Sequence, residues 1–84
     1  MNEFLKLKSD LYNESDCGML LGSDYAILIL PNNSTVEIEY FGDPPSATFG
    51  NDYVVKHGDI LLHTDSKHVF NDVLNIIESD KYRI

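Results

Sequence analysis

The clearest pattern of apolar and polar positions lies between residues 25 and 41. Residues 25–30 (YAILIL) form a continuous apolar run bounded by turn-forming residues, which predicts a central strand buried on both faces. Residues 35–41 alternate in the manner of a half-buried antiparallel strand. The inward positions are Val36, Ile38 and Tyr40, and the outward positions are Thr35, Glu37, Glu39 and Phe41. Residues 31–34 (PNNS) are typical of a turn, so the two strands are predicted to form a hairpin.

The C-terminal part of the chain predicts a second hairpin followed by a helix. Residues 52–56 and 60–63 are strand-like and flank residues 57–59 (HGD), which are typical of a turn and leave His57 in solvent. After Asp65 or Ser66, either of which can cap a helix, apolar residues recur with helical spacing. They are Val69, Phe70, Val73, Leu74, Ile76 and Ile77, and they define one buried helix face.

The N-terminal segment 1–13 fits two patterns. Residues 4–8 alternate as in a strand, whereas the apolar residues of the whole segment fall on one side of a helix, and we predict the helix. Those apolar residues are Met1, Phe4, Leu5, Leu7, Leu11 and Tyr12. Residues 17–21 form a short apolar stretch before a turn at 22–24. The elements together predict a single α+β domain over residues 1–84. A small antiparallel sheet of four or five strands packs on a C-terminal amphipathic helix, with a second short helix at the N-terminus.

Charge changes the picture of possible partners. The sequence has 14 acidic and 6 basic residues in 84, a formal net charge of −8. Such a surface repels phosphate backbones and anionic lipid, which argues against direct nucleic-acid or membrane binding, and it attracts basic proteins. The single cysteine, Cys17, allows no internal disulfide, and no apolar run is long enough to span a membrane or act as a signal peptide. We therefore expect a cytoplasmic protein, in the producing cell or its host.

No motif commits the chain to catalysis. A nucleophilic Cys17 would need to be exposed and within reach of His57, His63 or His68, and a lone cysteine is more often a small core residue. The histidine spacing matches no zinc motif, and Glu37 and Glu39 stand side by side on one strand face instead of facing each other across a cleft. We expect no enzyme activity, no metal and no cofactor.

The acidic surface supplies the leading functional hypothesis. Rows of carboxylates on a rigid scaffold imitate the charge spacing of a nucleic-acid backbone, and we expect a module that inhibits or regulates a basic, nucleic-acid-handling protein. The candidate binding residues are Glu37, Glu39, Phe41, Asp43, Phe49 and Asp24, around a Pro-containing loop at 42–51. Phage-encoded inhibitors of bacterial defence systems share this profile of size and acidity, as do many small regulatory domains.

Two alternatives remain open. In the first, a regulatory or immunity-type protein binds through an exposed aromatic patch of Phe41, Phe49 and Tyr53, and the charge serves only solubility. In the second, Cys17 and a histidine form an enzyme site. The sequence is compatible with a monomer or a homodimer.

Overall fold

The computed structural model describes residues 3–41 and 52–81, which fold into one five-stranded sheet and two helices. In chain order the elements are α1 (Glu3–Ser15), β1 (Gly18–Leu21), β2 (Tyr25–Ile29), β3 (Thr35–Tyr40), β4 (Tyr53–His57), β5 (Ile60–Thr64) and α2 (Val69–Lys81). The sheet is antiparallel throughout, in the order β1-β2-β3-β4-β5, so each strand pairs with its neighbour in sequence. The predicted α+β class, both hairpins and the N-terminal helix are confirmed.

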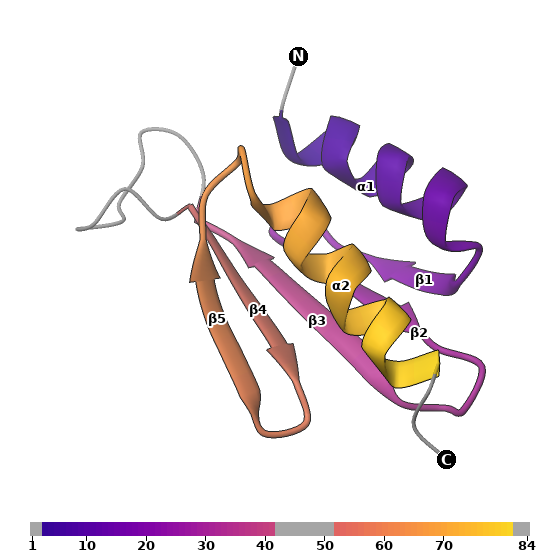
Figure 1. Ribbon diagram of the computed structural model, residues 1–84. Coiled ribbons are helices and arrows are strands. Elements are labelled where there is room, and N and C mark those ends of the chain that lie inside the picture. Colours follow the sequence, from indigo (N-terminus) through magenta and orange to yellow (C-terminus); the bar gives the residue numbers. More distant parts are fainter. Residues whose placement is uncertain (1–2, 42–51, 82–84) are drawn as a thin grey trace.

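Both helices lie on the same face of the sheet (Figure 1). The core forms between them and that face, because side chains at alternate strand positions point to one side. The sheet contributes Ala26, Leu28, Val36, Ile38, Tyr53 and Val55, and the helices contribute Phe4, Leu7, Leu11, Val69, Val73, Ile76 and Ile77. The predicted apolar faces of α2 and β3 are therefore the buried ones.

The prediction that residues 25–30 are buried on both faces is wrong. Ala26 and Leu28 are fully buried, but Tyr25 and Ile29 on the opposite face are exposed. The reason is that the described chain stacks both of its helices in one layer, and no described element covers the other face of β2. The apolar stripe of α1 is also narrower than predicted, since Leu5 and Tyr12 are exposed.

The tight turns follow from local residue chemistry. Gly58 and Asp59 join β4 to β5, with Gly58 at φ 58°, a conformation that glycine adopts without strain. Asn33, in the turn before β3, has φ 70°, and asparagine tolerates this region better than most residues. The turns fix the registers Ile29↔Thr35 and His57↔Ile60.

Asp65, one of the two residues predicted to cap α2, caps the start of this helix. Asp65 Oδ1 accepts hydrogen bonds from the backbone N–H groups of Lys67 and His68, both at 3.0 Å. His68 Nδ1 lies 2.7 Å from the same oxygen, and this hydrogen bond holds the pKa of the Asp65 carboxyl below its usual value. The first turn is also tied to the sheet, because Thr64 Oγ1 donates to Asp72 Oδ2 at 2.7 Å.

Candidate functional site

The face of the sheet opposite the helices carries a group of exposed apolar side chains. Leu20 on β1 is 56% exposed, and Tyr25 and Ile29 on β2 are 46% and 37% exposed. The register places Leu20 opposite Ile27, between Tyr25 and Ile29 on the same face. We call Leu20, Tyr25, Ile27 and Ile29 the apolar half of the uncovered face.

A glycine shapes one end of this apolar half. A Cβ atom at Gly22 would lie 2.1 Å from the ring of Tyr25, so the ring rests directly over the glycine backbone. Any side chain at position 22 would displace Tyr25. The bare backbone at this turn therefore sets the position of the aromatic ring on the uncovered face.

Charged residues lie beside the apolar half, on β3 and β4. Glu37 and Glu39 face the same side as Ile27 and Tyr25, their register partners on β2. Glu37 is exposed, whereas the Glu39 carboxylate lies 3.1 Å from Lys56 Nζ on β4. Because the pair is close to half exposed, its attraction is screened and worth little to stability, but it offsets one of the two negative charges.

The other predicted site residues have different outcomes. Asp24 lies in the β1–β2 turn, where its carbonyl oxygen accepts a hydrogen bond from Tyr40 N at 2.8 Å, and this brings it close to Phe41. Phe41 is exposed, as predicted. Asp24, Glu39 and Phe41 thus gather near one end of β3. The loop 42–51, which includes Asp43 and Phe49, lies outside the described residues. The described residues at its borders are Phe41 and Asp52.

The predicted patch of Phe41, Phe49 and Tyr53 is corrected at Tyr53. This side chain is 1% exposed, because it faces the helices at the start of β4. Its ring centroid lies 5.0 Å from that of Tyr40 and 6.2 Å from that of Phe4. Burial is the main reason that the pKa of the Tyr53 hydroxyl is raised, with the neighbouring Tyr40 adding to the effect. Tyr53 is therefore a core residue.

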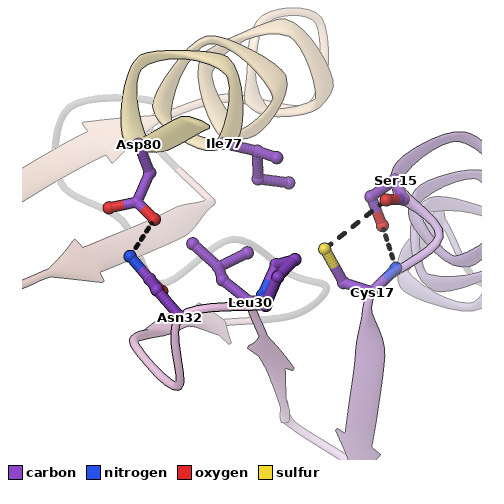
Figure 2. A pocket seen from close by; sticks show the side chains of 7 residues that line it. Ser15, Cys17, Leu30, Asn32, Ile77 and Asp80 are labelled. Carbon is purple, nitrogen blue, oxygen red and sulfur yellow. Dashed lines mark hydrogen bonds between the residues drawn. The ribbon is translucent and has the colours of Figure 1, made fainter. Parts of the chain in front are cut away.

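A second candidate site lies at the other side of the sheet, where the C-terminal ends of both helices approach the β2–β3 turn. A pocket of about 260 Å³ opens there, shown in Figure 2. It is lined by Ser15, Cys17, Leu30, Pro31, Asn32, Ile77 and Asp80. Apart from Asp80, the walls carry no charged side chain.

Asp80 is the centre of a buried polar network. Its Oδ2 accepts a hydrogen bond from Asn32 Nδ2 at 2.7 Å, and its Oδ1 lies 3.3 Å from His57 Nε2. The other ring nitrogen, His57 Nδ1, lies 2.8 Å from the carbonyl oxygen of Thr35. A carbonyl only accepts, so Nδ1 is the ring nitrogen that donates in this contact.

The position of His57 corrects the prediction of a solvated turn residue. It is the last residue of β4 and only 7% exposed. It follows Tyr53 and Val55 at alternate positions, so it points to the helix face of the sheet. The network joins α2, β4 and the β2–β3 turn. Both ring nitrogens of His57 are engaged within it, Nδ1 with the backbone carbonyl of Thr35 and Nε2 with the Asp80 carboxylate.

Cys17 does not meet the requirement set for a catalytic cysteine. Its side chain is 6% exposed, and its thiol lies 3.5 Å from the backbone oxygen of Ser15, to which it donates. His57 and His68 are engaged with Asp80 and Asp65. Within residues 3–41 and 52–81, no group of three or more His, Cys, Asp and Glu side chains is arranged to hold a metal ion.

Replacing Asp80 by alanine is expected to lower the free energy of unfolding by about 1–3 kcal/mol, because His57 and Asn32 lose a buried acceptor. The matched control is Asp10→Ala, which removes an exposed ion pair with Lys6 and should cost about 0.5 kcal/mol or less. Urea unfolding followed by circular dichroism measures both. Equal effects of the two substitutions would show that the Asp80 network does not anchor α2.

A comparison of the chain with protein families, curated proteins and solved structures finds no match. No helix in the described part of the chain is long and apolar enough to cross a membrane.

Proposed function

We propose that this protein is a binding module that inhibits or regulates a partner protein through the uncovered face of its sheet. The observation that carries the proposal is the group of exposed apolar side chains on β1 and β2 next to carboxylates on β3. An exposed apolar patch bordered by polar residues is typical of a protein interaction surface. The exposed Tyr25 ring adds an aromatic anchor of the kind that is enriched at such interfaces.

The charge of the chain defines the partner. With a net charge of −8, and with Asp24, Glu37 and Glu39 beside the apolar half, this face favours a surface that is apolar at its centre and basic at its border. Proteins that handle nucleic acid present such basic surfaces, and we place them first among the partner classes. The side chains of Glu37 and Glu39 stand about 6.6 Å apart along β3, a spacing suited to a row of basic groups.

The proposal also places the interaction in the cytoplasm. The chain has one cysteine and forms no internal disulfide, which suits a reducing compartment. Inhibition of a bacterial defence enzyme is one form of the activity, because such enzymes bind nucleic acid through basic channels.

The test is capture of the partner from a host lysate, elution with a salt gradient, and competition by DNA or RNA. Release at moderate salt and displacement by nucleic acid support the basic, nucleic-acid-handling partner. A partner that resists salt and ignores nucleic acid supports the alternative in which the apolar half binds and the charge serves solubility. A partner captured equally well by a variant lacking the apolar half contradicts the use of this face.

A further inference from the structure

The sheet ends in an open edge at β1. Among the strands of residues 3–41 and 52–81, in the order β1-β2-β3-β4-β5, only β1 and β5 have one paired side (Figure 1). Natural edge strands usually carry charged residues, proline or bulges that prevent pairing with another chain. The sequence of β1 (GMLL) has none of these, and both Leu20 and Leu21 are exposed.

The hairpin register shows which backbone groups lie on the open side. Gly22 N donates to Tyr25 O at 2.9 Å and closes the β1–β2 turn. Hydrogen-bonded and non-hydrogen-bonded pairs alternate along an antiparallel ladder, so Leu20 and Gly18 also direct their backbone groups toward β2. The N–H and C=O groups of Met19 and Leu21 therefore point outward, away from the sheet.

The surroundings of this edge favour a partner strand over a second copy of the chain. Asp16 and Asp24 are exposed and bracket β1. If two copies paired with Leu20 against Leu20, Asp16 of each would lie level with Asp24 of the other, and like charges opposite each other destabilise a sheet. Each copy also carries a net charge of −8. The same two aspartates attract basic residues at the ends of a different strand.

We propose that β1 accepts an extended segment of the partner protein as a sixth strand of the sheet. This inference rests on the proposed function and names how the partner binds. The segment has apolar residues at alternate positions, which extend the apolar half beyond Leu20, and lysine or arginine at both ends, opposite Asp16 and Asp24. Main-chain hydrogen bonds give affinity in this mode of binding, and alternate side chains give specificity.

The other edge, β5, does not offer the same combination. The uncovered face beside it carries Lys56 opposite the exposed Leu61, and the charge of this lysine opposes a basic segment. Asp65, at its C-terminal end, is already engaged in capping α2 and in its contact with His68. The backbone amides of β5 therefore serve as an internal control for pairing at β1.

The experiment measures amide hydrogen exchange by NMR with and without a synthetic nine-residue peptide, the length of the segment from Asp16 to Asp24. Its seven central residues alternate valine and threonine, and each end is lysine. In the free protein, the amides of Met19 and Leu21 are expected to exchange faster than those of Leu20 and Gly22. The peptide is expected to slow exchange at Met19 and Leu21 at least tenfold and to leave β5 unchanged. Two control peptides, one with N-methylated backbone amides and one with glutamate ends, should give no protection.

A pair of matched protein variants tests the same pairing between β1 and the peptide. Leu21→Pro removes an outward N–H without removing a hydrogen bond to β2, and it should abolish peptide binding. Leu61→Pro makes the equivalent change on β5, where Leu61 is similarly exposed, and it should leave binding intact. If Leu21→Pro does not fold, the N-methylated peptide still tests the hydrogen bonds.

Three outcomes would overturn the inference. They are no peptide binding at millimolar concentration, protection at β5 in place of β1, and concentration-dependent protection of Met19 and Leu21 without peptide, which would identify a second copy as the occupant. If the captured partner binds the uncovered face without protecting Met19 and Leu21, this inference fails and the proposed function stands.

Discussion

Val73→Asp is expected to leave the chain unfolded at room temperature. Val73 is fully buried on the face of α2 that packs on the sheet. The substitution forfeits about 1.5–3 kcal/mol of apolar burial, and an unpaired buried carboxylate costs several kcal/mol more. A domain of this length has a total stability of about 4–13 kcal/mol, so the loss is comparable to all of it.

The matched control is Asn75→Asp, which adds the same charge to the exposed face of α2. It should keep the wild-type circular dichroism spectrum and a dispersed NMR spectrum, whereas Val73→Asp should lose both. A Val73→Asp protein that unfolds within a few degrees of the wild-type Tm would mean that α2 packs through another face. Such a result would also remove the basis for an uncovered face, because the arrangement of the two layers depends on this contact.

The elements whose structure depends on neighbouring residues could be predicted from the sequence. The alternation of Val36 and Ile38 with Glu37 and Glu39 defines both faces of β3, because the period of two is a property of the strand itself. The helical spacing from Val69 to Ile77 likewise defines the buried face of α2. The turn at Gly58 follows from its freedom to adopt positive φ.

The candidate site was harder to predict, because it depends on which layer covers which face. Ile27 and Ile29 have the same apolar side chains whether or not a helix lies over them, so the run 25–30 alone does not distinguish a doubly buried strand from one with an exposed apolar face. Only the placement of α1 and α2 on one side of the sheet shows the difference.

His57 shows a signal that was present in the sequence and was missed. Its position continues the alternation of Tyr53 and Val55, so the parity of β4 directs it to the core. The turn-like sequence at 57–59 obscured this pattern. Its partner Asp80 lies 23 residues away on α2, and no local pattern indicates such a pairing. Predicting that a histidine is buried against long-range partners therefore requires the tertiary structure.

Replacing the apolar half is expected to weaken partner binding at least a hundredfold. The triple variant Leu20→Thr, Tyr25→Thr and Ile29→Thr removes three exposed apolar side chains and keeps residues that favour strands. Each buried apolar side chain contributes about 1–3 kcal/mol at an interface, so a total loss of at least about 2.8 kcal/mol, or a factor of a hundred, is a conservative expectation.

The control for the triple variant is Leu5→Gln with Tyr12→Gln. These two side chains are at least as exposed as Leu20 and Tyr25 but lie on α1, away from the uncovered face, and their replacement should leave the affinity unchanged. Isothermal titration calorimetry with the captured partner gives Kd for each protein, and circular dichroism confirms that each is folded. Equal losses in the two sets would show that binding does not use the uncovered face.

Changing Glu37 and Glu39, the carboxylates on β3 beside the apolar half, separates the role of charge in binding from that of apolar contact. Glu37→Lys with Glu39→Lys should leave the fold intact and abolish binding, because it places three lysines together where the partner is basic. Glu37→Gln with Glu39→Gln should instead slow association and flatten its dependence on salt, since exposed charges act mainly on the association rate. If the lysine variant binds as tightly as the wild type while the threonine variant does not, the acidic surface serves solubility and the apolar half alone recognises the partner.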